Sequence, residues 1–532
     1  MTALTQVEQG RQPAVTRRAA SLAEGPWLIT AAVMLATFME VLDTTVVNVS
    51  LTHIAGSLSA TPNEATWALT SYLVANGIVI PISGWLANHF GRKNLLLIST
   101  AGFTVASLLC GIAPSMGLLV TFRVIQGACG GSLQPLSQAV LLEAFPREQH
   151  GKAMAIFALG VIVAPVLGPV LGGWLTDNYS WRWVFYINLP VGVISVLMIK
   201  AFVKDPPYIR RSSAPVDSWG LATLVIWVAA LQIMLDKGQE EDWFNSRFIV
   251  VLAVAFAVGL LAWVTRELTT RDPVAELRVF GQAPFAAGTA AMAIASFAMY
   301  GSQVTISIWL QTLLGYPSAQ AGVAMLALGL GAALSMPVAS SLVSRFDPRK
   351  VFVCGVLTFS FSFYRLMGFN LNVGYWDVFW AEFIQGASMG LVFVPLMVLT
   401  MAFTPKERMG NATGLFNMMR NIGGGIGISM VATMLTRMGQ EHTNLLVANI
   451  TQTSPSVLSL LGGLRGLFAG SGPVLADQQA YAALFGLVQR EATMVALVRI
   501  FQYLGVLVLT LIPLIALTTR PPKVQAGTIA PH

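Results

Sequence analysis

The sequence predicts an all-α membrane protein with about fourteen transmembrane helices, arranged as six, two and six. Three observations predict this fold: the composition, the number of apolar segments and an internal repeat. Of the 532 residues, 55% are hydrophobic and 10% are charged, and the mean hydropathy is +0.69. Such a composition is typical of polytopic membrane proteins and excludes a string of soluble domains.

About fourteen apolar segments reach the roughly twenty residues that cross a bilayer. They begin near Trp27, Thr66, Leu95, Leu118, Lys152, Trp183, Ser218, Arg247, Pro284, Ala319, Val351, Trp376, Asn411 and Met494. Even-numbered connections between the segments are rich in Lys and Arg, whereas odd-numbered connections are poor in both. Because positive charge stays on the cytoplasmic side, we expect both termini to be cytoplasmic.

An internal repeat relates the two ends of the chain. Arg123–Ala128 (RVIQGA) in the fourth segment returns as Glu382–Ala387 (EFIQGA) in the twelfth, and Gly84–Lys93 corresponds to Ser341–Lys350. A shift of eight segments fits two halves of six separated by an inserted pair. The predicted parts are a tail (1–26), a six-helix bundle (27–205), the inserted pair with its loops (206–280), a second six-helix bundle (281–519) and a second tail (520–532).

The second bundle contains a predicted outer loop over residues 437–491. Apolar pieces such as Val457–Leu461 and Tyr481–Val488 lie in it. An interfacial or partner-binding helix and a poorly ordered spacer are both compatible with this loop.

Ionisable side chains at bilayer depth are costly, so each is a functional candidate. Glu40 and Asp43 are three residues apart on the first segment and share a helix face. A rise of about 1.5 Å per residue puts Asp43 roughly 24 Å from the inner end of its helix and Arg123 about 8 Å from the outer end of its own. These depths nearly coincide, so we expect Asp43 and Arg123 to meet in the outer half of the membrane.

A carboxylate at that depth can bind and release a proton, because burial favours its neutral form and a nearby guanidinium favours its charged form. We therefore interpret Asp43 and Arg123 as proton-coupling residues; a static ion pair that fixes helix packing is the alternative. The candidates for a substrate cavity are Glu40, Asn48, Gln126, Arg420 and Glu382. For Glu40 and Arg420 a packing role is the alternative, and for Glu382 a position near the outer surface.

The fifth segment combines prolines with glycines, at Pro165, Gly168, Pro169, Gly172 and Gly173. Proline bends a helix, and small residues let helices approach closely in lipid. This combination indicates a hinge or a tight seal. Ordinary packing would explain the glycines but not the two prolines.

Motifs of soluble enzymes are missing from the sequence. It has no phosphate-binding Gly-rich loop, no His or Cys cluster with metal spacing and no Gly-x-Ser-x-Gly elbow. The basic residues do not cluster, which argues against a nucleic-acid partner. We expect a transporter rather than an enzyme, with no cofactor and no metal, embedded in the lipid bilayer and driven by an ion gradient.

These segments together resemble the major facilitator superfamily, and specifically its fourteen-span drug:proton antiporter branch. Residues 42–49 (LDTTVVNV) resemble the first-helix signature of that branch, and Gly84–Lys93 resembles the superfamily loop between helices two and three. Arg123 with Gln126-Gly127 matches the fourth-helix motif, and the fifth segment matches the antiporter motif. Residues 231–243 are similar to the EmrB-type multidrug exporters in particular.

The resemblance implies a proton-coupled exporter of lipophilic or amphipathic compounds in a bacterial inner membrane, with a role in antibiotic resistance. It implies gating roles for Gly84, Gly91 and Arg92, and a periplasmic adaptor with an outer-membrane channel as partners. One departure is Asn88, where the motif commonly has Asp, so the inner gate must use a weaker hydrogen bond or other partners. The alternatives are an uptake or exchange transporter of a specific metabolite and, less favoured, a non-transporting receptor or scaffold.

Overall fold

The computed structural model describes residues 26–146, 149–205, 217–271, 273–448, 450 and 454–516. Throughout these residues the long elements are helices. Their bounds are α2 (Pro26–Val49), α3 (Leu51–Ser57), α4 (Pro62–Phe90), α5 (Arg92–Gly111), α6 (Met116–Gly130), α7 (Leu133–Ala144), α8 (His150–Asn178), α9 (Trp183–Tyr186), α10 (Asn188–Phe202), α11 (Ser218–Lys237), α12 (Arg247–Thr269), α13 (Ala283–Ile308), α14 (Ser318–Arg345), α15 (Pro348–Met367), α16 (Tyr375–Met401), α17 (Met409–Ala448), α18 (Pro455–Leu467), α19 (Pro473–Leu509) and α20 (Leu511–Ala516). Apart from Pro26, the predicted tails lie outside the described residues, as do residues 206–216 of the inserted part.

In the described ranges, 13 helical segments are long and apolar enough to cross a membrane. A further long helix, α17, has 40 residues and corresponds to the thirteenth predicted segment. The last segment differs from the prediction, since α19 begins at Pro473 and not near Met494. Polar residues such as Asp477, Arg490 and Glu491 hide this extension from a search for apolar runs, although they do not interrupt the helix.

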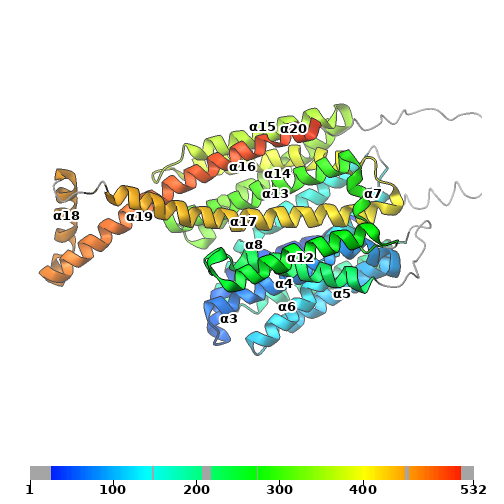
Figure 1. Cartoon of the computed structure of the whole chain (residues 1–532), viewed down its shortest axis with the longest axis horizontal. Coiled ribbons are helices and arrows are strands. Elements are labelled where there is room, and N and C mark those ends of the chain that lie inside the picture. The colour runs from blue at the N-terminus through cyan, green and yellow to red at the C-terminus, as the bar shows by residue number, and fades with distance from the viewer. Residues whose placement is uncertain are drawn as a thin grey trace, which may run out of the picture.

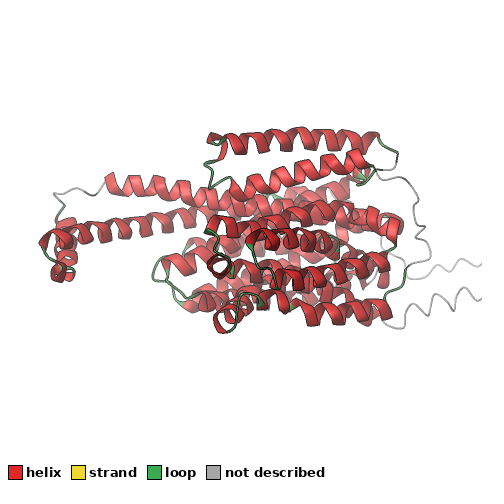
Figure 2. Ribbon diagram, turned by 90° about the horizontal axis from the view of Figure 1, so that it is seen from below, coloured by secondary structure: helices red, strands yellow, loops and turns green. Residues whose placement is uncertain are grey.

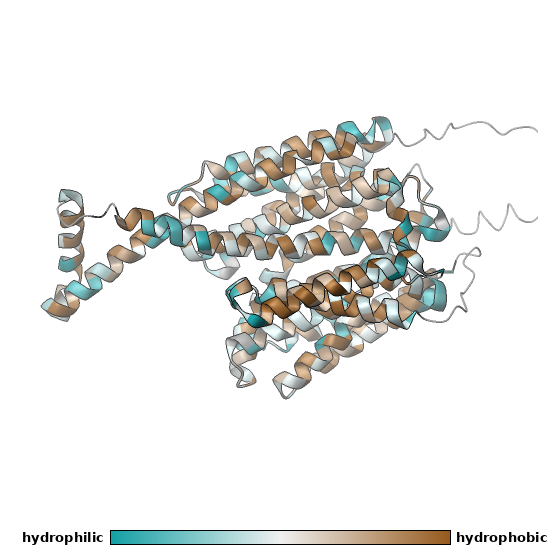
Figure 3. Cartoon of the chain, viewed as in Figure 1, coloured by the Kyte–Doolittle hydropathy of each residue, from teal (hydrophilic) through white to brown (hydrophobic). Residues whose placement is uncertain are grey.

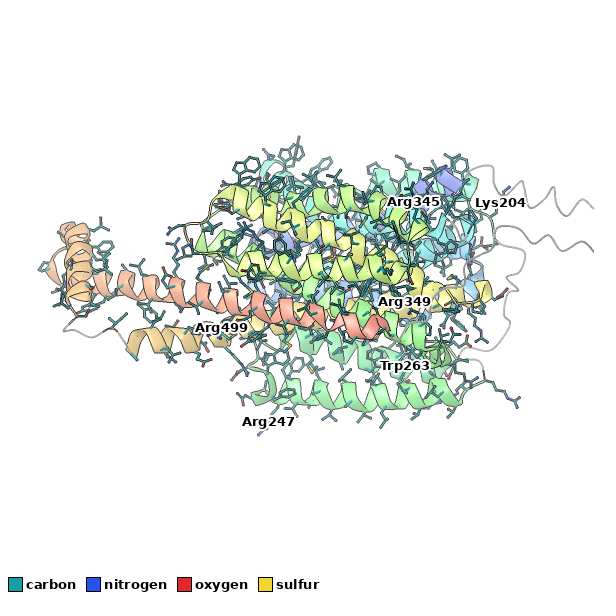
Figure 4. The ribbon with its side chains drawn as sticks, turned by 90° about the horizontal axis from the view of Figure 1, so that it is seen from above. Lys204, Arg247, Trp263, Arg345, Arg349 and Arg499 are labelled. Carbon is teal, nitrogen blue, oxygen red and sulfur yellow. The ribbon has the colours of Figure 1, made fainter. Side chains whose placement is uncertain are left out.

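The helices run side by side, so the bundle has two ends (Figure 1). Lys204, Arg345 and Arg349 lie at one end, which we call the basic end, and Arg247 lies at the opposite end (Figure 4). This matches the alternation in the sequence, because Lys204, Arg345 and Arg349 belong to even connections and Arg247 to an odd one. Hydrophobic residues cover most of the helix surfaces between the ends (Figure 3). The orientation of this bundle in the membrane stays a prediction.

The two copies of the repeat pack in the same way. Gly127 of α6 lies against the backbone of α4 at Tyr72, and Gly386 of α16 lies against the backbone of α14 at Leu328. Neither position has room for a Cβ atom. Since α4 and α14 are themselves eight segments apart, the shared glycine marks the same helix crossing in both halves.

The inserted pair consists of α11 and α12, which pack on each other, and α12, with Arg247 and Trp263, lies at the edge of the bundle (Figure 4). Arg266 of α12 pairs with Asp217, just before α11, at 2.9 Å, and this guanidinium holds the pKa of Asp217 below its ordinary value. The far end of α11 touches both halves: Lys237 donates to Thr66 of α4 at 2.7 Å, and Ser429 of α17 donates to the carbonyl of Leu235 at 2.7 Å. Thus α11 connects α4 to α17.

The segment 437–491 is helical over most of its length. The end of α17 and the start of α19 extend well beyond the bundle, and α18 lies across their tip (Figures 1 and 2). Leu461 of α18 packs there with Ala480 and Leu484 of α19. We call α18 with these two extensions the helical tip.

Candidate functional site

The centre of the candidate site is a buried ion pair between α2 and α6. Asp43 and Arg123 have exposed fractions of 1% and 0%, and Arg123 Nη1 donates to Asp43 Oδ2 at 2.5 Å. Arg123 Nε also donates to the carbonyl of Ala68 on α4 at 2.8 Å. The structure therefore brings these two residues together, as their depths in the sequence predicted, and their part in proton coupling stays a prediction.

Amide side chains surround the second oxygen of Asp43. Gln126 Nε2 donates to Asp43 Oδ1 at 3.0 Å, and Asn188 Nδ2 on α10 donates to it at 2.7 Å. Gln126 Oε1 in turn accepts from Arg123 Nη1 at 2.8 Å. An ionised carboxyl can accept all these bonds, whereas a protonated one carries a donor that would face other donors. Adding a proton to Asp43 therefore requires these contacts to rearrange.

Glu40, one turn from Asp43 on α2, has its own set of donors. Its Oε1 accepts from Asn76 Nδ2 at 3.0 Å and from the Tyr72 hydroxyl at 3.2 Å, both on α4. Its Oε2 accepts from Gln134 Nε2 on α7 at 2.6 Å. Tyr72 also joins the two carboxylates, because the Arg123 guanidinium lies 4.2 Å from the centroid of its ring.

We call this connected set the polar network; it consists of Glu40, Asp43, Tyr72, Asn76, Arg123, Gln126, Gln134 and Asn188. It reaches the other half of the chain through α17. Arg420 donates to Gln134 Oε1, and Asn417 Nδ2 donates to Gln138 Oε1 on α7 at 2.6 Å. Since Gln134 also donates to Glu40, one amide connects a carboxylate of α2 to a guanidinium of α17.

Two of the predicted cavity residues lie apart from the polar network. Glu382 is fully buried on α16, where Gln303 Nε2 on α13 donates to its Oε2 at 3.4 Å. Glu382 is therefore enclosed by other helices, and both its cavity-facing role and a position near the outer membrane surface stay predictions. Asn48 is exposed near the end of α2.

The glycines of the fifth segment press α8 against α2 beside Asp43. Gly168 lies against Thr45, and a Cβ added to Gly172 would lie 2.8 Å from the carbonyl oxygen of Val46. Gly173 has more room, with its nearest neighbour, Val49 Cγ1, at 4.0 Å. Pro165 and Pro169 lie inside α8, which continues through both as one helix. This geometry favours a tight seal between α2 and α8.

The predicted gating residues gather at the basic end, where the halves touch. A Cβ on Gly84 of α4 would lie 2.5 Å from the backbone nitrogen of Asn411 on α17. Gly91 has a φ of +85°, which favours glycine. Arg92 forms an ion pair with Glu143 of α7, and Asn88 is half-buried in the last turns of α4.

An apolar cavity of about 490 Å³ lies between α13, α17 and α19. Its lining consists of Ala293, Ile294, Phe297, Gly423, Ile426, Met430, Val431, Met434, Ile500, Tyr503, Leu504 and Leu507. Flexible Met side chains adapt to differently shaped apolar ligands. In the part of the chain that the structure describes, no group of three or more His, Cys, Asp or Glu side chains could hold a metal ion.

Sequence reasoning missed the uncharged members of the polar network: Tyr72, Asn76, Gln134 and Asn188. Each is a hydrogen-bonding side chain inside an apolar segment, which is a weaker signal than a charge. Gln134 has one further feature visible in the sequence: it directly precedes Pro135, in the same predicted segment as Arg123. A search for buried amides beside charged candidates would have found it.

Comparisons with known proteins agree with this fold. Residues 33–428 match the family model described as Major Facilitator Superfamily. The chain is 39% identical to the Multidrug export protein EmrB of Haemophilus influenzae over 429 residues, which cover 80% of this chain and 84% of that protein. It is 34% identical to the Fatty acid resistance protein FarB of Neisseria gonorrhoeae over 503 residues, which cover 94% and 97% of the two chains.

A solved structure has a similar fold at low sequence identity. The human organic anion transporter MFSD10 matches with a TM-score of 0.58 at 14% identity, covering 91% of this chain and 99% of that one. A likeness at this identity supports the arrangement of helices alone.

Proposed function

Because the chain belongs to the Major Facilitator Superfamily, we propose that it is a proton-coupled multidrug exporter that works by alternating access. Its substrates are lipophilic or amphipathic compounds, and the proton gradient drives their export. The names of its relatives support this class, since one is called a multidrug export protein and another a fatty acid resistance protein. The buried pair of Asp43 and Arg123 is the observation that carries proton coupling.

Asp43 is the proton carrier in this proposal. In the ionised form it accepts from Arg123, Gln126 and Asn188, which lie on α6 and α10. When a proton binds to its carboxyl, the attraction to Arg123 is lost and at least one donor must turn away. Because α8 packs against α2 at Thr45 and Val46, a shift of α2 also moves the seal between these helices.

Gln134 couples the protonation of Asp43 to the second half of the chain. It links Glu40, one turn from Asp43, to Arg420 on α17. Substrate that binds near Glu40 or Arg420 competes for the same amide, which couples its binding to the position of α17 relative to α7. The apolar cavity beside α17 supports a preference for lipophilic compounds.

The basic end is cytoplasmic in this proposal, in accordance with the positive-inside rule. The contact of Gly84 with Asn411 then belongs to the inner gate. The helical tip would lie on the outer side of a bacterial inner membrane, where it is the part of the chain that extends furthest. We assign it as the docking site for a periplasmic adaptor that leads to an outer-membrane channel.

Proton-driven accumulation of drug in energised inverted vesicles, which corresponds to efflux from the cell, tests the proposal. The variant Asp43→Asn keeps an acceptor for Arg123 but cannot take up a proton, so we expect it to bind substrate and to lose efflux driven by a pH gradient. Leu28→Ala, an exposed change on the same helix, serves as the matched control and should transport normally. Proton-driven efflux that persists in Asp43→Asn would overturn the role of Asp43.

A directional flux assay in proteoliposomes separates export from uptake. We expect a pH gradient to drive substrate in the direction opposite to that of the proton. Substrate that moves together with the proton would instead show a symporter on the same fold.

A further inference from the structure

Two buried oxygens in the second copy of the repeat lack a hydrogen bond among the described residues. They are Oε1 of Glu382 and Oε1 of Gln385, and both side chains have an exposed fraction of 0%. The two residues are one turn apart on α16, so their side chains share a helix face. Both atoms are acceptors when Glu382 is ionised, and two acceptors cannot satisfy each other.

In the first copy of the repeat, the corresponding glutamine oxygen has a hydrogen-bond donor. There Arg123 Nη1 donates to Gln126 Oε1 at 2.8 Å, and Gln126 Nε2 donates to Asp43 of α2 at 3.0 Å. In the second copy Gln385 Nε2 donates to Ser302 of α13 at 2.8 Å, at the equivalent pair of helices. What the second copy lacks is the donor that Arg123 supplies. A proton on Glu382 Oε1 would supply it.

Among the described residues, no ion pair takes the place of that proton. None of the ion pairs of the described residues includes Glu382, and its hydrogen-bond partner on α13, Gln303, is neutral. Of the titratable side chains on the helices packed on α16, Tyr300 is half-buried one turn from Gln303, and the others lie near helix ends or at exposed positions. The full set is Tyr300 on α13, Arg345 on α14, Arg349, Lys350, Cys354, Tyr364 and Arg365 on α15, and His150, Lys152 and Asp177 on α8, with Tyr375 and Asp377 on α16 itself.

We propose that Glu382 is a second proton-binding site of the transport cycle, protonated in this conformation and donating a hydrogen bond to Gln385 Oε1. The inference rests on the proposed function, since it assigns a further proton to the same cycle. The proton leaves Glu382 when α13 and α16 separate and water reaches the carboxyl. The proton leaves on the side of Gln303, because this residue is half-buried and donates to Glu382 Oε2.

Counting protons per substrate in proteoliposomes tests this site. The variant Glu382→Gln is neutral, and its amide can donate to Gln385 Oε1 as the protonated acid does, so we expect it to fold and to transport. We expect it to exchange one proton fewer per substrate than the unmodified protein. An unchanged count in a transporting Glu382→Gln variant would overturn the inference.

Infrared difference spectroscopy gives a second measurement that does not depend on transport. The unmodified protein minus Glu382→Gln should show the carbonyl band of a protonated carboxylic acid, which disappears when substrate and an opposing pH gradient drive the cycle. A carboxylate band instead, or an acid band that never changes, contradicts the proposal. Failure of the proposed function is distinguishable, because it appears as coupled transport that survives in Asp43→Asn.

Discussion

In the first copy of the repeat, α6 presents Arg123 to Asp43 of α2, whereas in the second copy α16 presents Glu382 to Gln303 of α13. The glutamine and glycine that follow make the same contacts in both copies. Each glutamine hydrogen-bonds to the first helix of its half, and each glycine packs against the second helix of its half. The difference teaches that the duplication shares its helix contacts and not its charges. The two halves have the same helix packing at the repeat but different buried charges.

The largest effect should come from removing the charge that only the first copy has. Removing one partner of a buried ion pair costs about 3–5 kcal/mol of stability, so Arg123→Gln should strongly destabilise the protein and, because Asp43 loses its guanidinium, abolish most of the pH-driven efflux. Glu382→Gln, the equivalent change in the second copy, leaves no charge unpaired. Thermal unfolding in detergent and efflux assays measure both. Equal losses in the two variants would contradict the comparison.

The shared glycines should respond alike. Gly127→Ala and Gly386→Ala each force a Cβ into the backbone of a neighbouring helix, and overpacking of this kind costs about 1–3 kcal/mol. Gly462 on α18 has no atom within 4 Å of an added Cβ, so Gly462→Ala is the matched control and should unfold at the temperature of the unmodified protein. If only one of the two repeat variants loses stability, the copies do not share a scaffold.

The repeat, the segment starts other than the last, and the meeting of Asp43 with Arg123 could be predicted because each depends on spacing along the chain. The helical period determines which residues share a helix face, and the rise per residue determines how deep each residue lies in the membrane. The partners of Glu40 could not be predicted in this way. Asn76 and Gln134 reach it from two other helices, and which amide meets which carboxylate depends on how the helices rotate and cross.

A helix within residues 437–491 was one of the two predicted alternatives, but the extensions of α17 and α19 into the helical tip escaped prediction, for a different physical reason. An apolar run signals a helix in lipid, but α19 begins in polar sequence at Pro473. Outside the bilayer a helix is stabilised by packing on one side alone, as Ala480 and Leu484 pack with Leu461. A search for long apolar runs does not detect so narrow a stripe.

A smaller effect is expected where the two halves are joined. Gln134→Leu removes the amide between Glu40 and Arg420, and the loss of these hydrogen bonds to buried charged groups costs about 1–3 kcal/mol, although Glu40 keeps its bonds from Asn76 and Tyr72. We expect efflux to fall by about tenfold while the contact of Asp43 with Arg123 stays in place. Gln138→Leu breaks the neighbouring contact with Asn417, but it unpairs no charge and should cost less. A larger loss in Gln138→Leu would place the coupling at Asn417 instead.

The smallest effect should follow from restoring the acid of the loop motif. Asn88 lies in the last turn of α4 and Arg92 begins α5, so an acid at position 88 gains about 0.2–1 kcal/mol from the guanidinium, although Arg92 already pairs with Glu143. In the second copy Arg345 corresponds to Asn88, so only the first copy can form this pair. Asn88→Asp should stabilise the closed basic end and slow the labelling of a cysteine placed at Asn411 by about twofold. Arg345→Asp, the matched change in the other half, should leave that labelling rate unchanged; equal slowing in both variants would mean that a general change of charge at the basic end, rather than this pair, controls the gate.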